Sequence, residues 1–157
     1  MLPAEELRYL ILAAQREGNR LLGRELKPLG VTSSQAEVLR ILQERQPLTL
    51  SGLGDLLICE SGNNPSRLVD RLTAAGLVDR RVAAHDRRHV ELTLTEEGMR
   101  LAHRITEIEN DLYRAIDAAA DGRDLDEITG FLRAFVEGLP SGQALSRRIG
   151  TEQESRS

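Results

Sequence analysis

Apolar residues recur in steps of three and four along most of the chain, and the first such run covers residues 7–26. This spacing places apolar side chains in a stripe on one side of a helix. Pro28 and Gly30 interrupt the pattern, because proline disfavours helix at the residue before it and glycine favours turns. The pattern therefore predicts an amphipathic helix over residues 3–28. Its apolar positions are Leu7, Leu10, Ile11, Ala14, Leu21, Leu22 and Leu26.

Two shorter helices are predicted next. Thr32 and Gln35 have the spacing of a capping box, in which each side chain bonds the backbone amide of the other residue. The apolar positions that follow are Val38, Leu39, Ile41 and Leu42. Pro47 ends this helix, and Thr49 is placed to cap a third one. The third helix carries Leu50, Leu53, Leu56 and Leu57.

A fourth helix, with an apolar and a polar face, follows a turn-like interval at residues 58–62. Its apolar face comprises Pro65, Leu68, Val69 and Leu72, and Gly76 marks its end. Two short helices joined by a tight turn form a helix-turn-helix. The polar positions are Asn63, Asn64, Ser66, Arg67, Asp70 and Arg71. Such side chains read base edges and bind phosphates in a DNA major groove, and the alternative interpretation is an ordinary solvated helix surface.

A two-stranded hairpin is predicted after Gly76. Residues 77–82 lead to an arginine-rich tip at residues 83–88, and residues 90–94 alternate apolar and polar side chains as a half-buried strand does. Thr95, followed by two glutamates, predicts the start of another helix, because a hydroxyl cap and acidic residues suit a helix N-terminus.

Two more helical stripes complete the pattern. One runs to residue 119, residues 121–124 interrupt it, and the second runs from residue 125 to residue 139. Residues 140–157 begin with a proline, a serine and a glycine and are polar, so we expect a flexible tail. The fold class is therefore mainly α, with an α+β character that comes from the hairpin alone.

The size and composition fit one folded domain. The chain has 157 residues, 40% of them apolar. A single cysteine excludes an intrachain disulfide, and the first residues lack the pattern of a signal peptide. No apolar run approaches the roughly 20 residues that cross a bilayer. We expect a cytoplasmic protein with no membrane partner.

The net charge of −4 argues against nucleic acid as a partner until its distribution is considered. Residues 61–90 hold six arginines against three aspartates, whereas residues 91–139 hold five arginines against twelve acidic residues. Arginine also dominates the basic residues, since Lys27 is the one lysine among 21. The guanidinium group suits bidentate contacts with phosphate and guanine. The central segment is therefore a candidate DNA-binding region.

Catalytic and cofactor chemistry is not indicated. The sequence shows no nucleophile and base pair, metal-ligand cluster or phosphate loop, so we expect no enzyme and no cofactor. Gly52 and Gly54 begin a dinucleotide-binding pattern, but Leu57 stands where that pattern needs glycine. His85 and His89 lie on the hairpin, where their spacing does not converge, and we expect no metal.

Cys59 lies among apolar residues, and we expect it to pack as a buried side chain. The alternative is a thiol that senses oxidants.

Three motifs in the central region are specific when taken together. Residues 68–78 read LVDRLTAAGLV, residues 85–88 read HDRR and residues 92–98 read LTLTEEG. With these motifs and this order of elements, the chain resembles the MarR family of bacterial transcriptional regulators to about residue 139. The family's oxidant-sensing members carry the reactive thiol near the first helix, where this chain has none.

The resemblance implies a single domain over residues 1–139. A winged helix-turn-helix lobe would span residues 30–97, and dimerisation helices would span residues 3–28 and 98–139. The expected assembly is a homodimer whose N- and C-terminal helices interlock and whose two lobes bind a palindromic operator in double-stranded DNA.

The resemblance also implies which residues contact DNA. Arg88 matches the wing arginine that enters the minor groove, where a narrow groove concentrates negative potential, and Asp86 matches the aspartate that steadies it. Pro65 departs from the family pattern, and Asn64 would then cap a shorter helix instead of reading bases. The implied DNA-binding positions are Ser61, Asn63, Asn64, Ser66, Arg67, Arg71, Arg87 and Arg88.

Family members bind small, often phenolic anions in a crevice between the dimer helices and the DNA lobe. By analogy alone, Tyr9, Arg16 and His103 are candidates to line that crevice, whereas packing at the dimer interface is the first interpretation for Tyr9. The resemblance thus implies a ligand-responsive repressor. The alternative function is a winged-helix protein-interaction module that no longer binds DNA, and the arginine-bearing wing argues against it.

Overall fold

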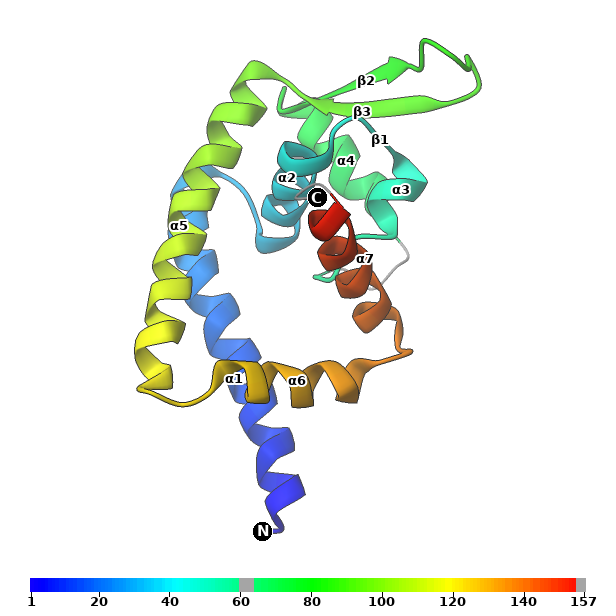
Figure 1. Ribbon diagram of the computed structural model, residues 1–157. Helices are drawn as coiled ribbons and strands as arrows, with labels where there is room; N and C mark the ends of the chain where they lie inside the picture. The colour runs from blue at the N-terminus through cyan, green and yellow to red at the C-terminus, as the bar shows by residue number, and fades with distance from the viewer. Residues whose placement is uncertain (60–63, 155–157) are drawn as a thin grey trace.

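The chain folds into a small lobe of helices and strands from which longer helices extend (Figure 1). The structure is a computed structural model that describes residues 1–59 and 64–154, with side chains described as far as residue 150. In chain order the elements are α1 (Pro3–Leu26), the 3-10 helix η1 (Lys27–Leu29), α2 (Ser33–Arg45), β1 (Leu48–Thr49), α3 (Leu50–Gly54), α4 (Pro65–Ala74), β2 (Val78–Val82), β3 (Val90–Leu94), α5 (Glu96–Ala120), α6 (Leu125–Val136) and α7 (Pro140–Glu154).

Threonine side chains begin three of these helices, as the sequence predicts. The Thr32 hydroxyl accepts a hydrogen bond from the Gln35 amide at 3.2 Å, and the Gln35 side chain accepts one from the Thr32 amide at 2.9 Å. The Thr49 hydroxyl accepts from the Gly52 amide, and the Thr95 hydroxyl from the Gly98 amide, each at 3.0 Å. Each cap satisfies an amide that has no partner inside its helix.

The sheet has three antiparallel strands in the order β1-β3-β2, one more than the predicted hairpin. Val78 pairs with Leu94 in the hairpin, and Leu48 of β1 pairs with Leu92 on the other edge of β3. The Gln46 side chain also accepts a hydrogen bond from the Leu94 amide at 2.7 Å. A strand of two residues is too short to show alternation in the sequence, so only the pairing with β3 reveals it.

The core of the lobe is built around α2. Side chains from α1 to α5 and from strands β2 and β3 pack against it, and each fully buried one contributes roughly 1.5–3 kcal/mol to stability. The largest fully buried side chains are Leu26, Val38, Leu39, Ile41, Leu42, Leu53, Val69, Leu72, Val78, Leu92 and Ile105. This core holds α3, α4 and the hairpin in fixed positions relative to one another.

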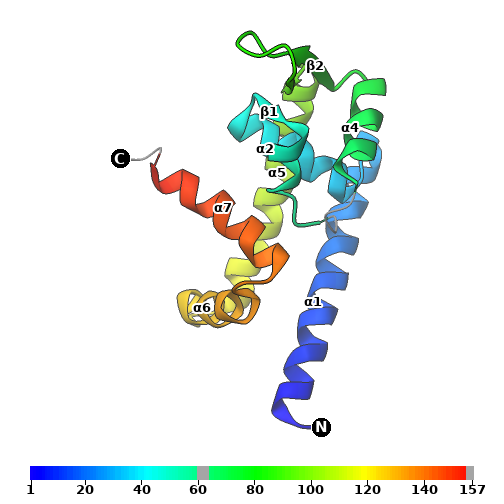
Figure 2. The ribbon, with the colours of Figure 1, turned by 90° about the vertical axis from the view of Figure 1, so that its right-hand side faces the viewer.

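The longer helices leave the lobe at one end. α1 and α5 run away from the lobe, α6 crosses the far end of α5, and α7 returns toward the lobe (Figures 1 and 2). Among the described residues, no helix is long and apolar enough to cross a membrane.

The prediction of a flexible tail after residue 139 is wrong for residues 140–154, which form α7. Ala144 is buried, and a Cβ atom added to Gly142 would lie 2.0 Å from the Val136 carbonyl oxygen, so α7 begins in close contact with the end of α6. The sequence predicts a tail because this segment carries no clear apolar stripe, whereas polar contacts with the lobe, described below, hold its second half.

Candidate nucleic-acid interface

Helix α4 presents a polar face to solvent. Leu68, Val69 and Leu72 are buried in the lobe, and this leaves Arg67 and Arg71 exposed on the opposite side, as the sequence predicts. Asp70 shares the exposed face, where it forms a salt bridge with Arg80 of β2. This ion pair offsets the acidic charge on the helix and leaves two guanidinium groups facing outward.

The start of α4 is only partly as the sequence predicts. Pro65 occupies the first turn, but the Asn64 side chain makes no capping bond to the helix backbone. It accepts instead a hydrogen bond from the Ser66 hydroxyl at 3.3 Å. Ser61 and Asn63, the other predicted contacts at this end, lie outside the described residues.

The tip of the hairpin holds one arginine in an outward position. The Asp86 carboxylate accepts hydrogen bonds from the Arg88 amide at 3.0 Å and from the Arg88 Nε at 3.3 Å, and its second oxygen lies 3.6 Å from His89 Nδ1. The Arg88 side chain is 90% exposed, whereas the Asp86 side chain is 28% exposed. Arg87 is also exposed. Asp86 thus orients a guanidinium group that projects into solvent.

Metal binding receives no geometric support in the part of the chain that the structure describes. There, no three histidine, cysteine, aspartate or glutamate side chains are grouped to hold an ion. What α4 and the hairpin offer is a set of cationic and amide donors on rigid elements, which suits a polyanionic surface.

The prediction that Cys59 is a buried packing residue is wrong, because the residue is exposed. Its thiol is nevertheless partly desolvated. Burial, followed by the charge of the nearby Glu37 carboxylate, raises the pKa of Cys59 to about 12. The thiol is therefore protonated at neutral pH.

Glu37 is a functional candidate that the sequence reasoning missed. Its side chain is 7% exposed, and it bonds the Ile58 amide at 2.9 Å and the Cys59 amide at 2.8 Å. An acidic residue within the apolar run of α2 is the one sequence signal that marks it. Its partners lie too far along the chain for spacing rules to identify them.

The three residues predicted to line an effector crevice have different neighbours. The Arg8 guanidinium lies 5.1 Å from the centre of the Tyr9 ring on α1, and Arg16 is exposed on the same helix. His103 of α5 lies beside α2, with its Nδ1 atom 3.0 Å from Gln43 Nε2. The described contacts give no single site that joins Tyr9, Arg16 and His103.

A polar cluster near His103 ties α2 to α5. The Arg40 guanidinium contacts the Glu109 carboxylate at 2.8 Å and the Glu44 carboxylate at 2.9 Å. Burial, and then the charge of Glu109, raises the pKa of Tyr113. Arg40 and Glu109 are 69 positions apart, so the sequence alone does not pair them.

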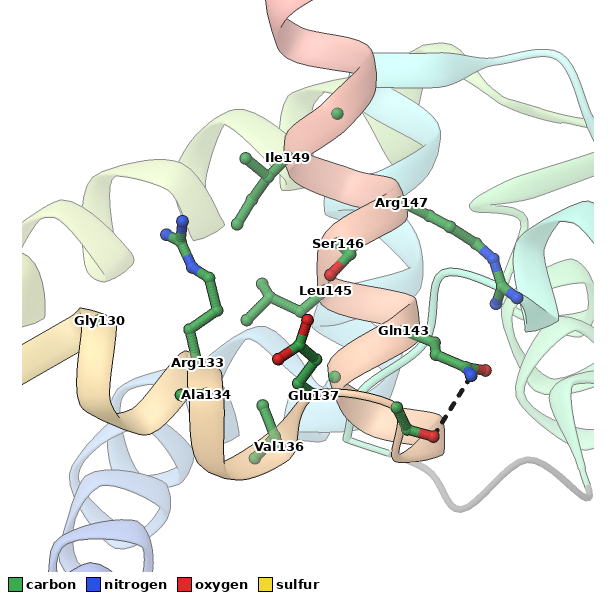
Figure 3. A pocket seen from close by; sticks show the side chains of 13 residues that line it. Gly130, Arg133, Ala134, Val136, Glu137, Gln143, Leu145, Ser146, Arg147 and Ile149 are labelled. Carbon is green, nitrogen blue, oxygen red and sulfur yellow. Dashed lines mark hydrogen bonds between the residues drawn. The ribbon is translucent and has the colours of Figure 1, made fainter.

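A cavity of about 660 Å³ lies between α6 and α7 (Figure 3). Leu145 and Ile149 of α7 line it, and Arg133 of α6 and Glu137, just after α6, extend toward them. Tyr9, Arg16 and His103 are not among its lining residues. The cavity is therefore distinct from the predicted effector crevice.

Comparison with known proteins assigns these elements to a recognised domain. Residues 31–98 match the winged helix DNA-binding domain, and they include α2 to α4 and all three strands. The chain is also 28% identical to the organic hydroperoxide resistance transcriptional regulator of Bacillus subtilis over 134 residues, which is 85% of this chain and 89% of the relative.

Solved structures share the arrangement beyond the lobe. A mutant of Escherichia coli MarR complexed with operator DNA matches with a TM-score of 0.68 and 25% identity, over 86% of this chain and 94% of that one. BpsR of Bordetella bronchiseptica, whose DNA binding is regulated by 6-hydroxynicotinic acid, matches with a TM-score of 0.75 and 18% identity, over 88% and 98% of the two chains. The latter likeness concerns the fold alone.

Proposed function

We propose that the chain is a member of the MarR family of winged helix-turn-helix transcriptional regulators, and that it is a repressor that binds a palindromic operator as a homodimer. α4 would lie in the major groove, with Arg67 and Arg71 contacting bases and phosphates. The wing, which is the hairpin of β2 and β3, would place Arg88 in the adjacent minor groove.

The observation that carries this proposal is that α4 and the wing lie at the same end of the molecule, away from α6 (Figure 2). One duplex lying across that end can meet both elements. Arg88 projects into solvent and donates hydrogen bonds to Asp86, and this orientation supports the minor-groove contact. Ser66, Asn64 and Arg87 complete the set of contacts proposed from the described residues.

Charge distribution supports the same orientation. The segment that contains α4 and the wing carries an excess of arginine, while residues 91–139, which include α5 and α6, hold twelve acidic residues against five arginines. Phosphate attracts the first surface and repels the second. DNA would therefore approach the lobe, and the acidic helices would face away from it.

Exposed apolar side chains support the homodimer. They gather on α1, on the second half of α5 and on α6, the helices that leave the lobe. An apolar surface of this extent is typical of a protein interface. The residues are Leu2, Leu7, Tyr9, Leu10, Leu12, Tyr113, Ile116, Ile128, Phe131, Phe135 and Leu139.

A small-molecule effector is the regulatory part of the proposal. By analogy with BpsR, whose DNA binding is regulated by 6-hydroxynicotinic acid, we propose an aromatic carboxylate as the class of ligand. Tyr9, Arg16 and His103 remain the proposed contacts, because the assembly of two chains would bring further surfaces near them. A ligand that favours a lobe separation unlike that of two half-sites, roughly 34–36 Å apart, would release the DNA.

Oxidant sensing is not part of the proposal, although the Bacillus subtilis relative is named for hydroperoxide resistance. The thiolate is the form that reacts with peroxides. The single cysteine of this chain has a pKa of about 12, so it forms little thiolate in neutral solution.

The test begins with selection of a duplex from a random DNA library by the unmodified protein. Fluorescence anisotropy then measures the affinity of the unmodified protein, of Arg67→Ala and of Arg88→Ala for this duplex. Loss of a base or groove contact should weaken binding by about tenfold or more. Arg104→Ala is the matched control, because it removes the same charge from an exposed ion pair on α5.

Two results would contradict the proposal. If Arg67→Ala and Arg88→Ala bind the selected duplex as the unmodified protein does, the docking mode is wrong. If no duplex is selected even at low salt, the protein does not bind DNA, and the interaction module becomes the better description.

A further inference from the structure

The C-terminal helix α7 is attached to the DNA-binding lobe by polar contacts from its second half. The Arg148 guanidinium lies 2.9 Å from the Glu37 carboxylate of α2. The Arg147 guanidinium donates to the Asp55 carbonyl oxygen at 3.2 Å, just after α3. Arg45, at the end of α2, donates to the Arg148 carbonyl oxygen. These contacts join α7 to the helices that precede α4.

The central residue of this attachment is Glu37, a buried carboxylate with both oxygens engaged. Oε1 accepts a hydrogen bond from the Ile58 amide, and Oε2 accepts one from the Cys59 amide. Ile58 and Cys59 come shortly before Asn64, the residue from which α4 begins. Glu37 therefore holds the backbone of Ile58 and Cys59, which precede α4 in the chain.

A buried carboxylate needs a countercharge, because removal from water strongly disfavours its ionised form. Arg148 supplies that charge, and it belongs to α7 rather than to the lobe. Of the α7 side chains that the structure describes, Ala144 is the one buried apolar residue. The ionic contacts therefore carry much of the attachment of α7 to the lobe.

We propose that Glu37 and Arg148 are positioning residues for DNA binding, and that α7 contributes to DNA binding because it supplies Arg148 to the lobe. Arg148 pairs with the Glu37 carboxylate and holds it in place, and Glu37 holds the backbone of Ile58 and Cys59, which precede α4 in the chain. The inference rests on the proposed function, since it concerns the element that would enter the major groove.

Direct contact of Arg148 with DNA is the competing explanation, and the placement of α7 argues against it. α7 approaches the lobe from the side opposite α4, with α2 and α3 between them (Figures 1 and 2). The two explanations also differ in salt dependence. Loss of a phosphate contact lowers the slope of log affinity against log salt by about one, whereas loss of a positioning residue leaves the slope unchanged.

The test uses Arg148→Met, which removes the charge and keeps an apolar side chain of similar reach. Affinity for the duplex selected by the unmodified protein is measured by anisotropy over a range of salt concentrations. We expect at least fivefold weaker binding with an unchanged salt slope. Arg148→Lys, which keeps the charge, should bind within about twofold of the unmodified protein, as should the control Arg104→Ala.

Hydrogen exchange of the free protein supplies a readout that does not depend on DNA. The Ile58 and Cys59 amides should exchange at least tenfold faster in Arg148→Met, while the amides of Leu39 and Leu42 in the core of α2 stay protected. If Arg148→Met does not fold, Arg45→Met is measured in the same way. It removes a bond to the α7 backbone without altering Glu37, and it should also weaken DNA binding.

The outcomes separate the inference from the proposed function. Unchanged affinity, a salt slope lowered by about one, or unchanged exchange at Ile58 and Cys59 would each overturn the inference while DNA binding stands. If the unmodified protein selects no duplex, the proposed function fails first, and the positioning role fails with it.

Discussion

At the scale of single residues, the Glu37 carboxylate contacts several groups from distant parts of the chain. It accepts hydrogen bonds from two successive backbone amides and pairs with Arg148, which lies 111 positions away. It also raises the pKa of the neighbouring Cys59 thiol. Burial of the thiol is the larger cause of that raised pKa, and the Glu37 charge adds to it. The reactivity of Cys59 therefore depends in part on the charge of Glu37.

Alkylation of Cys59 should show an unusual pH dependence. Because the thiolate is the reactive form and the pKa is about 12, the rate with iodoacetamide should rise about tenfold for each pH unit from pH 7 to pH 10. An ordinary thiol, with a pKa near 9.0, would level off within that range. Intact-mass spectrometry gives the rate directly, because the chain has one cysteine.

Glu37→Gln should accelerate this alkylation at pH 8. Removal of the negative charge lowers the pKa of Cys59, and each unit of lowering raises the thiolate fraction about tenfold. Glu44→Gln on the same helix is the control, since Glu44 is not among the groups that shift this thiol. Equal rates in the two variants would show that Glu37 does not act on the thiol.

At the scale of elements, the junction between β2 and α5 depends on the absence of a side chain. Gly98 lies in the first turn of α5, and a Cβ atom there would stand 2.0 Å from the Leu77 carbonyl oxygen. That oxygen also accepts a hydrogen bond from the Thr95 amide at 3.1 Å. The wing and the long helix thus meet through backbone contact, and this fixes the wing relative to α5.

Gly98→Ala should lower the free energy of unfolding by about 2 kcal/mol, because backbone on both sides must move to admit the methyl group. Gly23→Ala in α1 is the matched control. A Cβ atom there meets nothing within 4 Å, so the better helix propensity of alanine should raise stability by about 0.5–1 kcal/mol. Urea denaturation followed by circular dichroism distinguishes the two, and equal effects would contradict the close approach.

At the scale of the whole molecule, the two ends carry different surfaces. The lobe end presents arginine side chains on α4 and the wing, and the opposite end presents apolar side chains on α1, α5 and α6. This division fits a protein in which one end meets DNA and the other meets a second chain. It also explains why a net charge of −4 is a poor guide to its partner.

Phe135→Asp should convert a dimer into a monomer. The Phe135 side chain is 66% exposed in the single chain, so aspartate should leave the lobe folded, whereas a charge buried at the interface opposes association. Val82→Asp, on an exposed apolar residue of β2, is the control and should leave the oligomeric state unchanged. Sedimentation velocity measures both, and a dimeric Phe135→Asp would exclude α6 from the interface.

The elements that the sequence predicted are those set by neighbours within a few positions. Helical stripes and threonine caps depend on residues that are close in the chain, so spacing alone identifies them. The Asp86–Arg88 pair is also local, but it was the resemblance to the MarR family that implied it. The exposed arginines of α4 followed in the same way, because burial of one helix face determines the other.

Only the tertiary structure decided the features that join distant segments. β1 forms because it pairs with β3. α7 is held to the lobe because Glu37 and the Asp55 carbonyl accept hydrogen bonds from its arginines, and Arg45 donates one to its backbone. Cys59 is exposed although apolar residues precede it. In each case the deciding contact is polar and long-range. Hydrophobic periodicity describes which face of an element is buried, but it carries no information about which charges meet when the elements pack.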